Sequence, residues 1–173
     1  PSRDGYSIAS MPARLPGLEG QEWRERLGSP APVPVLNDAQ GALLGEIWLG
    51  AGKGARDAFL LTLGTGVGGA AIVDGRLLRG HLGRAGHLGH LSLDPAGAAD
   101  IVGTPGSLED AISNHTLGRR TKGRFADTRD LVEAAVSGDP DAREAWETSV
   151  RSLAAAVAGL INVLDPECVI LGG

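Results

Sequence analysis

Three separate stretches of the chain combine residue types that could carry out chemistry. The pair Asn37-Asp38 directly follows an apolar run, a glycine-rich turn spans Gly64 to Gly69, and Gly86–His90 contains two histidines. A carboxylate can accept a proton, and glycines leave backbone N–H groups open to an anion such as phosphate. The glycine pattern alone is weak evidence, because a hairpin that binds nothing would have the same sequence.

Short apolar runs on both sides of the glycine turn indicate how the turn is positioned. Phe59–Leu63 enters the turn, and Ala70–Val73 leaves it and ends at Asp74-Gly75. Asp and Gly tolerate positive φ at the central positions of a two-residue turn, so this dipeptide is a strong hairpin signal. We therefore expect a strand, a turn, an antiparallel strand, a second turn and a third strand.

Apolar periodicity predicts further elements around this hairpin. Apolar residues recur at helical spacing between Asn37-Asp38 and Gly50, and Asp141–Leu164 carries one continuous apolar stripe. The other expected elements are helices over Glu19–Leu27, Ser107–Thr116 and Thr128–Ser137 (capped by Thr128), strands at Tyr6–Ile8 and Glu167–Leu171, and an edge strand at Pro32–Leu36. Hairpins, long helices and a further buried strand together predict an α/β layered domain.

Composition excludes several classes of function. A chain of 173 residues with a net charge of −5 and 42% hydrophobic residues is typical of a globular domain, and nucleic-acid binding is not expected as its main role. Cys168 is the single cysteine, which excludes an internal disulfide and fits a cytoplasmic protein. No apolar run approaches the length of a membrane span. Because the chain lacks an initial Met and stops directly after a strand-like run, we expect a piece of a longer protein.

Several segments, taken in order, resemble one known family. VPVLNDAQGALLGE, LTLGTGVGG, GHLGRAGHLGH, GSLEDAIS and LINVLDPECVILGG resemble the ROK family of sugar kinases and sugar-responsive repressors, which includes bacterial glucokinases. The resemblance implies an actin-like ATPase fold built on ribonuclease-H-like halves. Residues 1–36 would be the remnant of the smaller N-terminal domain, and residues 37–173 would belong to the larger C-terminal domain.

The resemblance also implies a reaction, the ATP-dependent phosphorylation of a hexose or an N-acetylhexosamine. Asp38 matches the family's general base, which accepts the proton of the attacking sugar hydroxyl, and Asn37 would bind a sugar hydroxyl. A carboxylate that orients the nucleophile suits phosphoryl transfer, which depends on positioning and charge stabilisation. The structural alternative is that Asn37 or Asp38 only caps a helix.

The remaining site residues are carried over in the same way. Gly64, Thr65 and Gly66 would contact the nucleotide phosphates, with Mg²⁺ between them and the catalytic carboxylate. Glu109 and His90 match family positions that bind the sugar. The alternative for Glu109 is a solvated glutamate that favours the first turn of its helix.

The chain departs from the family in two ways. Family kinases usually have glutamate where this chain has His87, which leaves the sugar preference and the activity open. The family's three zinc-binding cysteines are replaced by Asp100, Val102 and Ser107. His87 and His90 could pair with His81 or Asp100 as other ligands, but flanking glycines give no helix to align them. Zinc is therefore not expected.

Two further readings stay open beside the kinase. The chain could belong to a sugar-sensing regulator that kept the fold and lost catalysis, or to a purely structural domain. The family's first phosphate loop has no counterpart in the sequence, so the piece alone should be inactive. The expected partners are ATP, a sugar and a second copy in a homo-oligomer; nucleic acid is expected only with an added DNA-binding segment.

Overall fold

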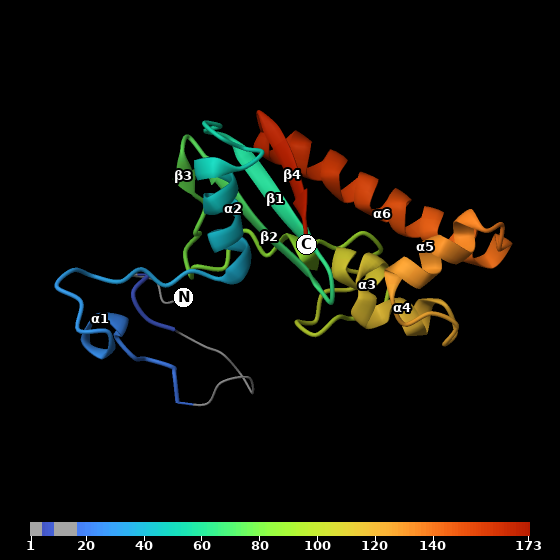
Figure 1. Cartoon of the computed structure of the whole chain (residues 1–173), viewed down its shortest axis with the longest axis horizontal. Coiled ribbons are helices and arrows are strands. Elements are labelled where there is room, and N and C mark those ends of the chain that lie inside the picture. The colour runs from blue at the N-terminus through green and yellow to red at the C-terminus, as the bar shows by residue number, and fades with distance from the viewer. Residues whose placement is uncertain (1–4, 9–16) are drawn as a thin grey trace.

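The computed structural model describes residues 5–8 and 17–173, and a four-stranded mixed sheet lies at its centre (Figure 1). The strands are β1 (Ala58–Leu63), β2 (Val67–Val73), β3 (Arg76–Leu77) and β4 (Cys168–Gly172), in the order β3-β2-β1-β4. β2 is antiparallel to both β1 and β3, whereas β4 runs parallel to β1. The predicted double hairpin is confirmed, and Asp74 and Gly75 have φ values of 54° and 72°.

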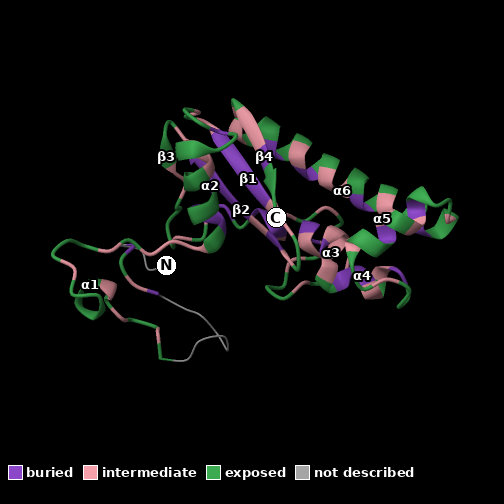
Figure 2. Cartoon of the chain, in the orientation of Figure 1, coloured by how far each residue is buried: buried purple, intermediate pink, exposed green. Residues whose placement is uncertain are grey.

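Because successive side chains of a strand point to opposite faces of the sheet, the hydrophobic core is divided between the two faces. Phe59 and Leu61 face helix α6 (Pro140–Leu164), where they pack with Ala156 and Leu160. Ala58 and Leu60 face the other way and pack against helix α2 (Asp38–Leu49) through Leu43. Figure 2 shows that β1 and β2 are the most completely buried strands, because helices cover both of their faces.

Helix α6 confirms the long apolar stripe predicted from the sequence. Asp139 caps its start by accepting a hydrogen bond from the Ala142 N–H at 2.9 Å, and Pro140 occupies the first turn. Asp165 ends the helix in a left-handed conformation with φ 44°. The first half of α6 packs on α5 (Thr128–Val136) in a separate small core that includes Leu117, Leu131, Ala135 and Ala142.

Several expected elements differ from the structure. The helix expected over Ser107–Thr116 is two helices, α3 (Leu108–Ile112) and α4 (Asn114–Arg120), which break at Ser113 where ψ is 156°. Helix α5 is capped by Asp127 rather than by Thr128. Pro32–Leu36 forms no strand, and β4 is the edge of the sheet, so only Ile170 in it is buried.

The N-terminal part of the described chain is irregular. It holds the short helix α1 (Trp23–Arg26), in place of a helix over Glu19–Leu27, and a single bridge between Ile8 and Glu19. Residues 1–4 and 9–16 lie outside the described part, and nothing here tests a domain boundary at residue 36. Within residues 5–8 and 17–173, no helix is long and apolar enough to cross a membrane.

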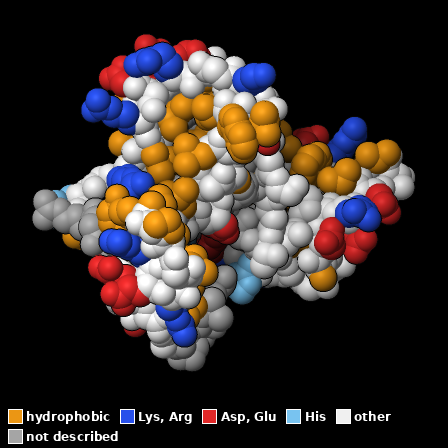
Figure 3. Space-filling view, turned by 60° about the vertical axis from the view of Figure 1, so that its left-hand side comes forward, with side chains coloured by type: hydrophobic (Ala, Val, Ile, Leu, Met, Phe, Trp, Pro, Cys, Tyr) orange, Lys and Arg blue, Asp and Glu red, His pale blue; other side chains and the backbone are white. Residues whose placement is uncertain are grey.

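Hydrophobic side chains gather on the surface around α2 and the sheet edge. Figure 3 shows such a gathering on one face of the molecule. The exposed large hydrophobic residues include Leu44, Trp48 and Leu49 of α2 and Leu171 of β4. These side chains are exposed to solvent in the described structure.

Candidate active site

The start of α2 separates the roles of Asn37 and Asp38. The Asn37 side chain accepts a hydrogen bond from the Gln40 N–H at 2.7 Å, and the Gln40 side chain accepts one from the Asn37 N–H at 3.2 Å. This reciprocal pair is a capping box, so Asn37 caps the helix and Asp38 does not. Asp38 is exposed, and only its Oδ1 atom has a partner in the described structure, the Ala39 N–H at 2.9 Å. Its second oxygen is open to solvent.

Helix α2 is packed tightly against the glycine hairpin. Ala39 is buried, and a Cβ atom on Gly68 would lie 3.4 Å from the Ala39 Cβ and would collide with Thr62. Glycine at position 68 therefore allows the first turn of α2 to approach the sheet. Since Asp38 directly precedes Ala39, the backbone of Asp38 lies near the end of the hairpin that carries the glycine turn.

The glycine turn itself presents free backbone donors. The Gly64 carbonyl accepts a hydrogen bond from the Asn114 N–H at 3.1 Å, and the Thr65 carbonyl accepts one from the His115 N–H at 2.9 Å. The N–H groups of Thr65 and Gly66 have no acceptor among residues 5–8 and 17–173. A Cβ on Gly64 would meet nothing within 4 Å. The turn is thus fixed through its carbonyls and by the Gly64 N–H, which donates to the Gly66 carbonyl at 3.0 Å, while the Thr65 and Gly66 N–H groups stay without an acceptor in the described part of the chain.

Glu109 reaches the glycine turn from the opposite face of the sheet. Its Oε2 atom accepts a hydrogen bond from the Val67 N–H at 2.9 Å, and a Cβ on Gly66 would lie 2.6 Å from the same oxygen. Ser107 caps helix α3 just before Glu109. Glu109 is therefore a half-buried carboxylate that contacts β2, and not a solvated residue of the first turn.

His90 ends a short 3-10 helix, η1 (Leu88–His90), which is packed against β2, and His87 directly precedes this helix. Side chains at Gly69 and Gly89 would collide with Leu88 and with the Val67 carbonyl, so glycine is required at both positions. The rings of His87 and His90 are 6.3 Å apart. Desolvation first, and then the charges of His90 and Arg84, lower the pKa of His87, so this imidazole is neutral at pH 7.

His90 is held by an acidic residue that the sequence analysis considered only as a metal ligand. Its Nδ1 atom lies 2.7 Å from Oδ2 of Asp100, whose side chain is fully buried. Burial raises the pKa of Asp100, but hydrogen bonds from Thr104, His90, Val102 and Ser107 outweigh it and lower the pKa to about 2. The sequence signal that could have pointed to this contact was Asp100 itself, an acidic residue at a position where the family has cysteine.

The residues around Asp100 do not fit a zinc site. Val102 offers no ligand atom, and both oxygens of Asp100 already accept hydrogen bonds from protein donors. Zinc takes four nitrogen, sulfur or oxygen ligands. In the described part of the chain, no group of three or more His, Cys, Asp or Glu side chains could hold a metal ion.

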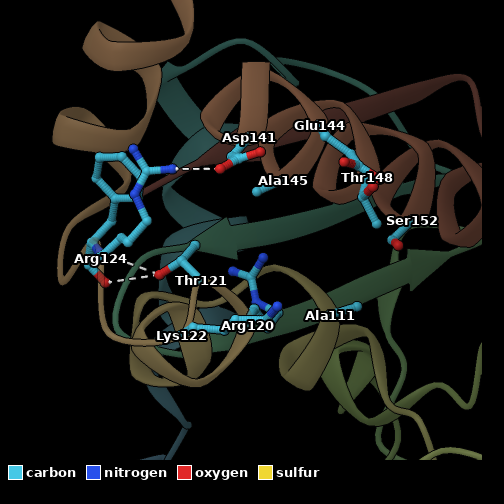
Figure 4. Close-up of a pocket in the computed structure, with 11 residues that line it drawn as sticks. Ala111, Arg120, Thr121, Lys122, Arg124, Asp141, Glu144, Ala145, Thr148 and Ser152 are labelled. Atoms are coloured by element: carbon cyan, nitrogen blue, oxygen red, sulfur yellow. Dashed lines mark hydrogen bonds and ion pairs between the residues drawn. The ribbon is translucent and has the colours of Figure 1, made fainter. Parts of the chain in front are cut away.

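One cavity lies away from these residues. It has a volume of about 580 Å³ between α4 and α6, and Arg120, Arg124 and Asp141 are among its lining residues (Figure 4). Arg124 there pairs with Asp141 at 3.0 Å. A second cavity of about 190 Å³ borders Gly64 and Asn114. Only the second cavity adjoins one of the predicted site residues.

The structure thus brings most of the predicted residues to one end of the β1–β2 hairpin. Comparison with known proteins then decides the family, because the sequence model of the ROK family matches residues 21–173. The chain belongs to the ROK family. It is 41% identical over 145 residues to the bifunctional enzyme NanE/NanK of Brucella melitensis, covering 83% of this chain and 27% of that protein. It is 38% identical over 158 residues to a glucokinase of Thermotoga maritima, covering 82% of this chain and 50% of that enzyme. The ROK chain therefore spans half or less of the length of these two relatives.

Solved structures of ROK proteins confirm the predicted α/β, actin-like ATPase fold. A ROK hexokinase from Thermus thermophilus matches 99% of this chain and 58% of its own with a TM-score of 0.86 and 34% identity. A ROK glucokinase from Streptomyces griseus, in complex with glucose and AMPPNP, matches 99% of this chain and 62% of its own with a TM-score of 0.79 and 29% identity. A ROK transcriptional regulator homologous to the MLC protein of E. coli matches 99% of this chain and 47% of its own with a TM-score of 0.81 and 28% identity.

Proposed function

We propose that this ROK chain forms the sugar-phosphorylating part of an ATP-dependent kinase that acts on a hexose or an N-acetylhexosamine. One observation carries the proposal. The exposed Asp38, with one carboxylate oxygen unpartnered in the described structure, begins the helix whose first turn packs on the hairpin, and the turn of that hairpin has N–H groups at Thr65 and Gly66 without an acceptor among the described residues. A proton acceptor next to an anion-binding turn is the minimum that phosphoryl transfer requires. Relatives named glucokinase and the glucokinase complex with glucose and AMPPNP support the same substrates.

In the proposed reaction, Asp38 acts as the general base. Its free oxygen accepts the proton of a sugar hydroxyl while that hydroxyl oxygen forms a bond to the γ-phosphorus of ATP and ADP leaves. The N–H groups of Thr65 and Gly66 donate hydrogen bonds to phosphate oxygens, with Gly64 leaving room for them. Preorganised donors of this kind stabilise charge in the transition state without reorganisation.

Magnesium fits the proposed site better than zinc does. Mg²⁺ prefers oxygen ligands and keeps several waters, so it needs few protein groups. The exposed carboxylate of Asp38 could hold the ion near the phosphates through one of these waters, which leaves its free oxygen to accept the proton. When bound, the ion would neutralise negative charge on the phosphate oxygens.

Four residues are proposed to bind the sugar. Asn37 has an amide N–H₂ with no partner among the described residues, since only its oxygen is used by the helix cap. Glu109 uses Oε2 on Val67, which leaves Oε1 to accept a hydroxyl hydrogen bond. His87 and His90 would complete the pocket, with His87 in the position of the family glutamate.

A sugar-sensing regulator is the second candidate. Two observations favour it, namely histidine at position 87 and a ROK transcriptional regulator among the similar structures. The intact Asp38 and glycine turn favour the kinase.

Under either proposal we place residues 37–173 in the larger domain and residues 1–36 in the smaller one. We also expect a cytoplasmic homo-oligomer, and no turnover by this chain alone, because it spans only part of its relatives.

The test is a phosphoryl-transfer assay on the complete protein that contains this chain. ADP formation from ATP is measured with a panel of hexoses and N-acetylhexosamines, and sugar binding is measured separately by calorimetry. Sugar-dependent ADP formation at least about 10-fold above the sugar-free rate is the expected result, since a positioned base alone contributes more than that. Sugar binding without any turnover would contradict the kinase and support the regulator.

A further inference from the structure

The loop between η1 and α3 is organised around one buried carboxylate. Asp100 has a fully buried side chain and accepts a hydrogen bond from each of the Val102 and Thr104 N–H groups at 2.9 Å. Its other oxygen lies 2.7 Å from His90 Nδ1, and a hydrogen bond from the Ser107 side chain further lowers the pKa of this carboxyl. A buried carboxylate with four donors is a fixed, fully satisfied acceptor.

Further hydrogen bonds connect the segment of His90 to α3, the helix that carries Glu109. Ser107 accepts a hydrogen bond from the Asp110 N–H at 3.2 Å and so caps α3. The Leu108 N–H donates to the Leu91 carbonyl at 2.8 Å, which ties the residue after His90 to the residue before Glu109. Asp100 is therefore linked directly to His90 and, through Ser107, to the start of the helix that carries Glu109.

The pairing with Asp100 fixes the protonation pattern of the neutral imidazole. An ionised carboxylate can only accept hydrogen bonds, so His90 must carry its proton on Nδ1 to bond with Asp100. In a neutral ring the other nitrogen then has a lone pair and no proton. The His90 side chain is 20% exposed, so Nε2 is the part of the ring left to act as an acceptor.

We propose that Asp100 is a positioning residue that orients His90 without a metal. It holds the ring in the Nδ1–H form and directs the Nε2 lone pair, as an acceptor, toward a hydroxyl of the sugar. Buried carboxylates orient functional histidines in the same way when they lie behind metal-bound imidazoles. Only the last step, contact with the sugar, rests on the proposed function. The fixed tautomer is a property of the chain itself.

The first experiment reads the tautomer directly. Histidine ¹⁵N chemical shifts are recorded by NMR on the complete protein at about pH 9, well above the ordinary histidine pKa of about 6.5. We expect His90 to be mainly the Nδ1–H form in the wild type. Asp100→Asn should lose this preference, because its amide can donate to Nδ1. Asp94→Asn is the matched control, since Asp94 is exposed in the same loop and its side chain accepts one hydrogen bond in the described structure, from the Ala96 N–H at 2.9 Å.

The outcomes separate this proposal from the proposed function. An Nε2–H tautomer in the wild type, or a tautomer unchanged by Asp100→Asn, would overturn the role of Asp100 whether or not the protein is a kinase. Should Asp100→Asn fail to fold, the wild-type tautomer still decides. In the kinase assay, Asp100→Asn should raise the sugar KM about 10-fold and change kcat less, whereas Asp94→Asn should change neither. A KM equal to that of the wild type would contradict the sugar contact, and a wild type without turnover would refute only the kinase.

Discussion

The carboxylates of Asp38 and Asp100 show how environment assigns different roles to one residue type. Asp38 is exposed, and one of its oxygens has no partner in the described structure. Asp100 is buried, and four donors hold its pKa at about 2. The first arrangement leaves a base available to a substrate, whereas the second keeps a charge fixed in place. Sequence alone could not separate them, because the partners of Asp100 come from turn geometry.

Acid should weaken the fold through Asp100. Its pKa in the folded chain is about 2, below the ordinary 3.8, so its stabilisation is fully present above about pH 4. That stabilisation is lost as the pH falls through 2. Asp100→Asn should therefore lower the free energy of unfolding by at most about 2 kcal/mol at pH 6 and by much less near pH 2. Urea denaturation across this range measures the difference, and an equal loss at both pH values would contradict the assignment.

His87 should set the sugar preference. A carboxylate accepts stronger hydrogen bonds from hydroxyls than a neutral imidazole does, so His87→Glu should lower the sugar KM or change its rank among sugars. Because the pKa of His87 is lowered, the wild-type KM should stay constant from about pH 8 down to about 6.5 and change only below. Steady-state kinetics on several hexoses provide the measurement. Identical KM values for every sugar in both proteins would place His87 outside the pocket.

At the scale of elements, the β1–β2 hairpin and its glycines decide where the site lies. Glycines at positions 68, 69 and 89 are explained by close packing with α2 and η1. Packing does not explain Gly64, since its φ is not in the left-handed region and a Cβ atom added there would meet no atom within 4 Å. The nucleotide proposed to bind at the turn would account for it, because glycine allows a close approach.

A pair of glycine variants tests this distinction. Gly64→Ala should change the free energy of unfolding by less than about 0.5 kcal/mol, because its Cβ meets nothing within 4 Å, yet it should raise the ATP KM. Gly66→Ala should destabilise the chain by about 1 to 3 kcal/mol, since its Cβ would displace Glu109 from Val67. Thermal melts and kinetics measure both effects. An unchanged ATP KM in Gly64→Ala would remove the turn from the nucleotide site.

Local signals explain which elements could be predicted. The Asp74-Gly75 turn and the apolar stripe of α6 are each determined by residues close together in the sequence, and both predictions are confirmed. The break at Ser113 and the exposed edge at β4 depend on tertiary packing, which no local pattern encodes. The same holds for the site. Asn37 and Asp38 were found as a pair, but which one caps the helix depends on Gln40.

At the scale of the whole molecule, the sheet brings residues from both of its faces to one end of a hairpin. Asp38 arrives on α2 from one face, whereas Glu109 and His90 arrive on α3 and η1 from the other. This arrangement is the fold shared with the ROK hexokinase and the ROK regulator. Under the proposed function, the residues at that end determine whether the protein transfers phosphate or only senses the sugar.

The intact molecule should contain no stoichiometric zinc. The three positions that hold cysteine in the family hold Asp100, Val102 and Ser107 in this chain. The charge of Asp100 is already satisfied by protein donors. Elemental analysis of the purified protein is the measurement, and a chelator should leave its melting temperature unchanged. About one zinc per chain, lost in His90→Ala, would contradict this expectation.

The most direct test of the account is Asp38→Asn in the complete protein. Asn37 rather than Asp38 caps α2, so the melting temperature should change by no more than a few degrees. The variant keeps the shape of the side chain and loses its proton acceptor, so kcat should fall by about 10² to 10⁴ with sugar binding retained. Near-normal turnover in Asp38→Asn would contradict the account, because the reaction would then proceed without the base that defines the proposed site.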